Sequence, residues 1–360
     1  MRRPTLTLPL AVTFVVLGLA AALAARTRLL VRPAAAAPAK AEPAAVEPVT
    51  AKPQPAPAPP GPLAPNEAGQ IMVLMYHRFE PKPGDWNRTP ADFRRDLETL
   101  YREGYRLLPL RDLLAGRITT PRGYTPVVLT FDDGWRTQCN YLEKDGKLEV
   151  DPDSAVGILE AFAKAHPDMG LAGTFYLNAD PFGQPKLAKA KLEHLIGEGF
   201  ELGNHTVNHT NLRQASAQVG RKEMAGMVTI INQLVPGHRM DTMALPFGAL
   251  PHDRSVAVSG TVDGVSYHNK AVLLVGANPA PSPYATAFDP LNLPRVQGSE
   301  AELGRWLAYF RSHPEARFVS DGKADVITVP ASRRGELGAG LPTEQGRKVE
   351  VLPAASPGAR

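Results

Sequence analysis

The stretch Val127-Val128-Leu129-Thr130-Phe131-Asp132-Asp133-Gly134 joins an apolar run to two adjacent carboxylates and a glycine. A continuous apolar run is typical of a strand buried on both faces of a parallel sheet. Asp132 and Asp133 then lie on the turn that leaves the strand. Desolvating two neighbouring carboxylates is costly unless a cation or a chemical task requires them. The stretch therefore predicts a parallel α/β fold with a functional site at the carboxyl end of this strand.

A second polar cluster lies later in the chain, at Asn204-His205-Thr206-Val207-Asn208-His209. The i, i+4 spacing of His205 and His209 predicts that both imidazoles share one face of a helical turn. One carboxylate and two imidazoles form a three-ligand metal set with a position left open for water. Of Asp132 and Asp133, we expect one to bind the metal and the other to take the proton from the attacking water. The two clusters together indicate hydrolytic metal chemistry.

Short apolar runs alternate with helical patterns between residues 67 and 332. This alternation predicts parallel βα units, which close into a barrel or stack in an open sheet. Strands are predicted at residues 71–75, 127–131, 172–177, 242–245, 272–275, 317–319 and 326–329. Helices are predicted at residues 90–103, 153–164, 186–197, 212–234 and 300–312.

The two ends of the 360-residue chain differ from this central part. The largely apolar run from Leu6 to Ala25 is long enough to span a bilayer, so residues 1–32 are expected to be a signal peptide or a membrane anchor. Residues 33–66 are rich in Pro and Ala and predict a disordered linker. Residues 333–360 predict a disordered tail. The folded domain, residues 67–332, is thus expected on the periplasmic or extracellular face, held at the membrane if the N-terminal segment is not cleaved.

Charge and cysteine content exclude several classes of protein. The net charge is only +4, and the Lys and Arg residues form no dense runs, so nucleic-acid binding is not expected. The single cysteine, Cys139, cannot form an intramolecular disulfide and is expected to be a small packing residue. The sequence indicates no particular protein partner.

The two motifs resemble those of the polysaccharide deacetylases that share the NodB homology domain, also called carbohydrate esterase family four. The resemblance covers roughly residues 71–330. Gly173-Thr174-Phe175-Tyr176-Leu177 is similar to the third core strand of the family, and Leu245-Pro246-Phe247-Gly248 is similar to its third motif. Val73-Leu74-Met75-Tyr76-His77 and Leu293-Pro294-Arg295-Val296 are similar to elements of the branch that includes poly-N-acetylglucosamine deacetylases. The resemblance implies a distorted (β/α) barrel of the NodB type.

The resemblance also implies a set of roles. Asp132 would be the base, and Asp133, His205 and His209 would hold a divalent metal. The metal is usually zinc, although cobalt, nickel or iron also suits such ligands. The main-chain N–H of Phe247 would help to hold the oxyanion that forms when water attacks an acetamide carbonyl.

The implied substrate is an N-acetylated amino sugar in an envelope or extracellular polysaccharide such as peptidoglycan, a chitin-like polymer or poly-N-acetylglucosamine. Two alternatives stay open. One is a polysaccharide O-acetyl esterase, which would form the same oxyanion. The other is a catalytically degenerate carbohydrate-binding domain that retains the metal.

Two positions depart from the family pattern. Ala244 stands where many members carry an arginine that pairs with the base, and Arg295 is the candidate replacement. The last predicted strand, residues 325–329, lacks the histidine that protonates the leaving amine in the family. His77, at the end of the first predicted strand, is the preferred substitute acid. The alternatives are His268, His313 and water held by the metal.

Four further side chains are candidates for supporting roles. Trp86 and Trp135 carry rings that can stack on a sugar face. Thr206 and Asn208 flank the two histidines and are candidates for orienting the imidazoles.

Overall fold

The computed structural model describes residues 63–338 and 346–353. Within these residues, eight strands form one sheet in the order β11-β8-β7-β6-β3-β1-β12, with β2 beside the start of β3, and every pairing is parallel. The predicted α/β architecture is confirmed. The strands are β1 Met72–Tyr76, β2 Tyr105–Leu107, β3 Thr125–Phe131, β6 Thr174–Leu177, β7 Glu201–Asn204, β8 Thr242–Ala244, β11 Ala271–Leu273 and β12 Val296–Gln297.

The two ends of this sheet are joined by the segment from Leu293 to Gln297. Leu293 pairs in parallel with Leu273 of β11, and three residues later Val296 pairs in parallel with Leu74 of β1. Because the same short segment bonds to both ends of the strand order, the sheet curls into a distorted barrel. Arg295 lies between the two pairings and is fully buried.

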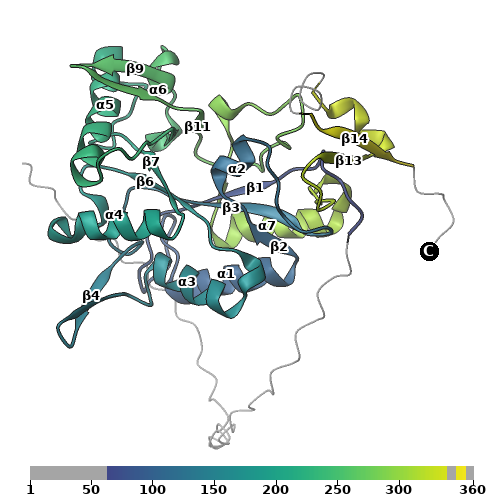
Figure 1. Ribbon diagram of the computed structural model, residues 1–360, viewed down its shortest axis with the longest axis horizontal. Helices are drawn as coiled ribbons and strands as arrows, with labels where there is room; N and C mark the ends of the chain where they lie inside the picture. The colour runs from purple at the N-terminus through teal and green to yellow at the C-terminus, as the bar shows by residue number, and fades with distance from the viewer. Residues whose placement is uncertain (1–62, 339–345, 354–360) are drawn as a thin grey trace, which may run out of the picture. The chain divides into compact units, whose positions relative to one another are not determined.

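Besides the main sheet, the described residues form seven α-helices and three separate two-stranded sheets (Figure 1). Side-chain caps start the longer helices: Thr89, Ser154, Ser216 and Ser299 each accept a hydrogen bond from a backbone N–H in the first turn. The helices are α1 Pro90–Arg102, α2 Leu110–Leu114, α3 Ala155–Ala165, α4 Ala188–Gly197, α5 Ala217–Leu234, α6 Ser255–Val258 and α7 Glu300–Ser312. The additional strands are β4 Tyr141–Lys144 with β5 Lys147–Val150, β9 Ser259–Val262 with β10 Val265–His268, and β13 Val326–Pro330 with β14 Lys348–Leu352.

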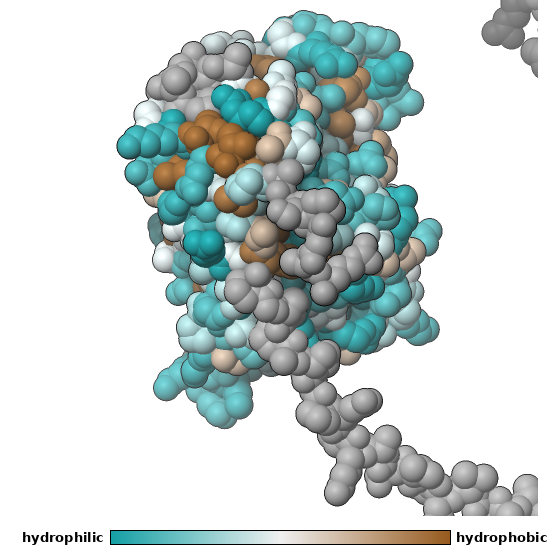
Figure 2. Space-filling model, turned by 90° about the vertical axis from the view of Figure 1, so that its right-hand side faces the viewer, coloured by the Kyte–Doolittle hydropathy of each residue, from teal (hydrophilic) through white to brown (hydrophobic). Residues whose placement is uncertain are grey.

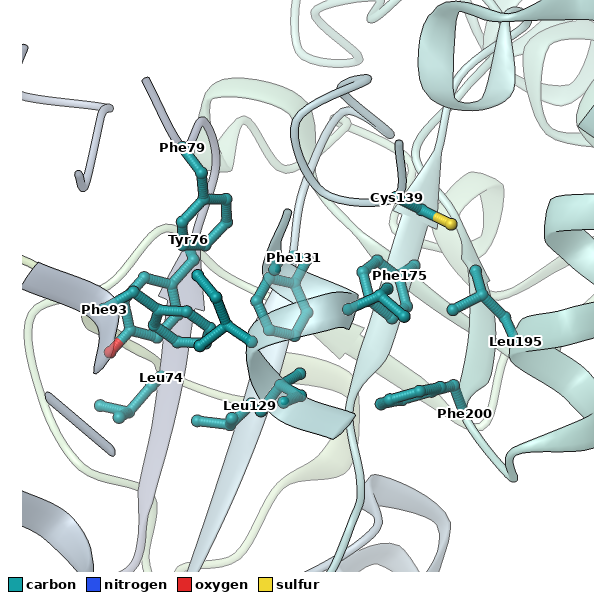
Figure 3. Packing of buried hydrophobic residues seen from close by; sticks show 14 of the residues in the cluster. Leu74, Tyr76, Phe79, Phe93, Leu129, Phe131, Cys139, Phe175, Leu195 and Phe200 are labelled. Carbon is teal, nitrogen blue, oxygen red and sulfur yellow. The ribbon is translucent and has the colours of Figure 1, made fainter. Parts of the chain in front are cut away.

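A row of aromatic rings fills the space between the sheet and its helices (Figure 3). The ring of Phe131 on β3 stacks on that of Phe175 on β6 at 4.7 Å, and Tyr76 on β1 meets Phe93 of α1 at 5.0 Å. Cys139 is buried in the same cluster, and burial raises the pKa of its thiol to about 12. Its predicted role as a packing residue is confirmed, because a thiol in this environment stays protonated.

Strand alternation separates this outer core from a second, inner face of the sheet. On β3, Val127, Leu129 and Phe131 belong to the aromatic cluster, whereas Val128 belongs to the inner cluster. Because successive side chains of a strand point to opposite faces, Thr130 and the following Asp132 share the inner face with Val128. The barrel interior therefore receives polar side chains from a strand that is otherwise apolar.

Most predicted elements are present, with shifts of a few residues at their ends. Residues 317–319 are an exception, because Arg317 and Val319 form only isolated bridges to the segment before β1. The helix predicted from residue 212 begins at Ala217, since the Asn211 side chain first accepts hydrogen bonds from two backbone amides of a turn.

The C-terminal tail is a further correction, since part of residues 333–360 is ordered. Strand β14 pairs in parallel with β13, Val349 packs against the inner core, and Lys323 forms an ion pair with Glu350 at 2.9 Å. Along β14, Val349 supplies the apolar contact, whereas Lys348, Glu350 and Val351 are exposed. Figure 2 shows the corresponding side of the molecule, where hydrophilic residues predominate between small hydrophobic patches.

The N-terminal predictions fall on residues that are largely outside the described part. Residues 1–32 and most of the predicted linker lie there. Among residues 63–338 and 346–353, no helix has the length and apolar character needed to cross a membrane. The linker boundary shifts slightly, because Asn66 is buried and exchanges backbone hydrogen bonds with Val319.

Glu67, near the start of the folded domain, is hydrogen-bonded to strand β13 near its end. Its carboxylate accepts a hydrogen bond from the backbone N–H of Thr328 on β13 at 2.8 Å, and the side chain is fully buried beside Asp321. Burial and the neighbouring Asp321 carboxylate raise the pKa of Glu67 to about 8 and outweigh the lowering by the Thr328 amide. The folded domain therefore keeps a proton that the unfolded chain releases near pH 4.5.

We expect this proton to make the stability pH-dependent. An acid whose pKa is raised by folding destabilises the folded state as pH rises from the unfolded to the folded pKa, here from 4.5 to about 8. Glu67→Gln should therefore become more stable relative to the unmodified chain across this range, as measured by urea unfolding at several pH values. Exposed Glu80→Gln is the control, and a difference that does not change with pH would contradict the assignment.

Candidate active site and metal centre

The predicted site residues meet at the edge of the sheet where the parallel strands end. A cavity of about 270 Å³ opens there. Its walls come from segments that directly follow β1, β3, β7, β8 and β11, which is where parallel α/β folds assemble their sites. The lining residues are His77, Arg78, Trp86, Asp132, Asp133, His205, His209, Leu245, Phe247 and Val275.

Asp133, His205 and His209 form a compact three-ligand set. Oδ1 of Asp133 lies 3.3 Å from Nε2 of His205 and 3.3 Å from Nε2 of His209. The ligand atoms of the three residues all lie within 4.8 Å of one another. The predicted helical turn is wrong, since Thr206 and His209 have positive φ angles of 63° and 52° and the segment is an irregular turn. The turn nevertheless directs both imidazoles to the same carboxylate.

The hydrogen bonds of His205 show that this set fits a cation. Nδ1 of His205 lies 2.8 Å from the carbonyl oxygen of Ala244, so Nδ1 carries the proton and donates it. Nε2 of the neutral imidazole then presents a lone pair. This buried Nε2 makes no hydrogen bond to the described residues, although it faces a carboxylate oxygen. Two lone pairs at 3.3 Å repel each other unless a cation lies between them, as in metal sites where a backbone carbonyl orients the histidine.

The local charges agree with this interpretation. Burial raises the pKa of Asp133, but its contacts with His205, His77 and the Trp135 N–H outweigh burial, so its net pKa is well below the usual range. Burial and the neighbouring His205 lower the pKa of His209. Both shifts keep the groups in the ionised carboxylate and neutral imidazole forms that bind a metal.

Trp135 holds the second oxygen of Asp133. Its indole Nε1–H donates to Oδ2 at 2.8 Å, which leaves Oδ1 for the two imidazoles. The guanidinium of Arg78 covers the indole ring at 3.9 Å from the ring centre. This contact is different from the predicted sugar stacking, because one ring face is occupied by Arg78 and the N–H orients a candidate metal ligand.

Asp132 has a different partner. Its two carboxylate oxygens each accept a hydrogen bond of 2.7 Å from the guanidinium of Arg295, and Nη1 of Arg295 also lies 3.1 Å from Oγ1 of Thr130. Arg295 thus occupies the role expected of an arginine at position 244. Burial raises the pKa of Asp132, but Arg295 and the nearby imidazoles outweigh this effect and lower its pKa overall. The carboxylate is therefore ionised at neutral pH.

Of the three histidines that are candidates for the acid, His77 is the one that lies in this cavity. Its Nε2 lies 3.9 Å from Oδ2 of Asp132, and its ring packs edge-on against Trp86 at 4.8 Å. Burial lowers the pKa of His77 more than the two aspartates raise it. Gln138, which the sequence did not reveal, donates to the backbone carbonyls of both His77 and Asp132 and so links the ends of β1 and β3.

Phe247 lies at the rim of the cavity. Its backbone has a positive φ of 58°, its ring is 65% exposed, and the ring contacts the imidazole of His209 at 4.5 Å. A left-handed conformation is strained for a bulky residue and is often found at functional sites. This backbone conformation places the main chain of Phe247 beside the cavity.

Four other candidates lie elsewhere or act differently. His268 ends β10 in another cavity, and exposed His313 caps the end of α7, so neither reaches the site. Thr206 accepts a hydrogen bond from Thr210, and Asn208 binds Glu223, so neither side chain orients an imidazole through these bonds. The backbone of the His205 segment is held by Asn178, whose side chain donates to the carbonyls of His205 and Thr206 at 2.7 Å.

Comparisons with known proteins agree with this geometry. Residues 120–261, which contain both motifs, match the family model described as polysaccharide deacetylase. This part of the chain is therefore similar in sequence to polysaccharide deacetylases. A chitin deacetylase of Arthroderma benhamiae is similar, with 29% identity over 143 residues, 39% of this chain and 32% of the relative. The chain thus spans about a third of the length of that curated relative.

A solved structure of a deacetylase shares the fold. The Streptococcus pyogenes deacetylase PplD, solved in complex with acetate, has 19% identity and a TM-score of 0.50, covering 68% of this chain and 98% of that chain. IcaB from Ammonifex degensii has 17% identity and a TM-score of 0.47, covering 67% of this chain and 97% of that chain. The likeness to PplD shows the distorted (β/α) fold of the NodB type.

The Trp135 contact leads to a test. Trp135→Phe keeps the ring but removes the N–H that holds Oδ2 of Asp133, so the affinity for zinc should fall roughly 10- to 100-fold, the usual effect of losing a group that orients a ligand. Competition with a chromophoric chelator measures this affinity. Trp86→Phe, in the same cavity but without a bond to a ligand, is the matched control. Equal zinc affinity in both variants would contradict the role of Trp135.

Proposed function

We propose that this chain is a metal-dependent hydrolase that removes N-acetyl groups from amino sugars of an envelope or extracellular polysaccharide. The observation that carries the proposal is the placement of the Asp133, His205 and His209 set beside a separate, ionised Asp132 in one cavity. A site that only bound metal would not require this second carboxylate. The family of residues 120–261 supports the same chemistry.

The size of the cavity supports a small reacting group on a large substrate. Its volume of about 270 Å³ is below the usual range for sites that enclose a drug-sized ligand. Leu245 and Val275 supply apolar walls for a methyl group, and the cavity is also lined by polar side chains such as those of Asp132 and His77. An acetyl group can enter while the polymer stays outside.

The proposed reaction breaks the C–N bond of an acetamide and forms a C–O bond from water. A divalent metal such as zinc, cobalt, nickel or iron would polarise the carbonyl group and acidify water when bound. Asp132 takes the proton from water, and Arg295 holds both oxygens of that carboxylate in place. The N–H of Phe247 is proposed to donate to the oxyanion.

The departing amine needs a proton, and His77 is the proposed donor. Its imidazole is 3.9 Å from Asp132, so it can receive the proton that the carboxylate took from water. The lowered pKa keeps the imidazole neutral at rest and therefore able to accept that proton. Acetate and a free amine are then released. This assignment replaces the histidine that is missing from residues 325–329.

The proposal includes the setting of the enzyme. We propose export to the periplasmic or extracellular face, supported by the apolar run from Leu6 to Ala25. If this segment is retained, it would hold the domain at a membrane through the linker at residues 33–66. The substrate would then be a polymer of the cell envelope or its surroundings.

Replacement of the base is the first test. Asp132→Asn keeps the shape of the side chain but cannot take the proton, so acetate release from N-acetylglucosamine oligomers should fall by ~10²- to 10⁴-fold. Zinc content, measured by elemental analysis after chelation and reloading, should stay at that of the unmodified chain. Asp263→Asn, in the exposed turn between β9 and β10, is the matched control.

Other outcomes separate the alternatives. Release of acetate only from O-acetylated polysaccharide would favour an esterase. Stoichiometric zinc with no release from either substrate would favour a carbohydrate-binding domain and contradict the proposed function.

The role of His77 has its own test. His77→Gln should lower kcat for acetamide substrates by about 10²-fold. An aryl acetate ester has a leaving group that departs without protonation, so its hydrolysis should change much less. His313→Gln, at the exposed end of α7, serves as the control. Equal loss on both substrates would show that His77 does not act as the acid.

A further inference from the structure

A larger groove adjoins the catalytic cavity. Its volume is about 690 Å³, and it shares His77 and Trp86 with the smaller cavity. The groove runs between the loop that follows β1 and the start of α7, on the same edge of the sheet as the candidate metal ligands. A polymer whose acetyl group enters the smaller cavity therefore passes Trp86 into this groove.

Trp86 is exposed on a loop that hydrogen bonds keep ordered. Its backbone carbonyl accepts a hydrogen bond from Arg78 N–H at 3.1 Å, and Gly84 and Asn87 exchange two backbone hydrogen bonds of 3.1 Å across the loop. The Gln297 side chain also donates to the backbone of Asp85. Despite these restraints on its loop, the Trp86 side chain is 48% exposed. An exposed indole on an ordered loop offers a stacking surface at little entropic cost.

The charges of the groove are mainly negative. Its walls include Asp85, Glu300 and Glu302 but a single guanidinium, that of Arg88. Arg88 is already bound by Asp96 at 2.6 Å and by Glu300 at 3.0 Å, so it contributes little free positive charge. Glu302 pairs with Arg305, whereas Asp85 has no ion pair among the described residues. A cationic group in the groove would therefore find complementary charge beside Trp86.

We propose that this groove binds the sugar next to the one that reacts, with Trp86 under its ring, and that it selects a sugar whose amine is free and positively charged. The inference rests on the proposed deacetylase function and adds a substrate preference to it. A free amine on an amino sugar is the product of that reaction. The enzyme would then act preferentially beside units that have already lost their acetyl group, which produces blocks of free amines along the polymer.

The test compares two pentasaccharides of N-acetylglucosamine, one fully acetylated and one with glucosamine beside acetylated units. For the full chain loaded with zinc, kcat/KM should be about three- to fivefold higher for the second substrate, as expected for one partly exposed charge pair. High salt should reduce this ratio. Asp85→Asn should bring it close to one, and Asp263→Asn should leave it unchanged.

The outcomes distinguish the two proposals. Acetate release at equal kcat/KM from both substrates would overturn the groove proposal and leave the deacetylase function standing. A preference that persists in Asp85→Asn would also overturn the groove proposal. No release from either substrate would overturn the proposed function, and the groove proposal with it. Trp86→Ala should lower kcat/KM for both pentasaccharides by roughly two- to tenfold, the loss expected for one stacked ring.

Discussion

The buried ion pair between Arg295 and Asp132 is the constraint on which the barrel and the site both depend. Both side chains are at most 1% exposed, and two hydrogen bonds of 2.7 Å join them. Removing one partner of such a pair leaves an uncompensated charge in the interior, which is strongly destabilising. Arg295 lies on the segment that bonds to both β11 and β1, so the pair ties the closure of the sheet to the edge that carries the candidate active site.

This pair also explains how two neighbouring aspartates can act differently. The inward direction of Asp132 follows from strand alternation and leads to Arg295. At Asp133 the backbone has a positive φ of 74°, so the chain turns and its carboxylate faces His205 and His209 instead. One carboxylate is thereby neutralised by a guanidinium and the other is available to a cation. Environment, more than residue type, separates their proposed roles.

The sequence predicted strands β1, β3, β6, β8 and β11, and it drew attention to the two polar motifs that line the cavity, because their signals are local. Strands such as β3 are continuous apolar runs, and the helices carry caps and periodic apolar residues.

Strand β7 was not predicted, since Glu201-Leu202-Gly203-Asn204 has little apolar character. Its Gly203 is needed because a Cβ there would lie 2.3 Å from the Tyr176 ring. Strand β14 was missed because its order comes from pairing with β13. The contacts of Gln138 and Trp135 likewise depend on the turn after β3, which no sequence periodicity reveals.

A double-mutant cycle in the free energy of unfolding measures whether Arg295 and Asp132 act as one coupled unit. Arg295→Met, Asp132→Asn and the double variant would be unfolded in urea at pH 7. We expect Arg295→Met alone to destabilise the chain by about 3–5 kcal/mol, and adding Asp132→Asn to recover much of this loss. Losses that simply add, with the double variant the least stable of the three, would show that Arg295 and Asp132 are not coupled.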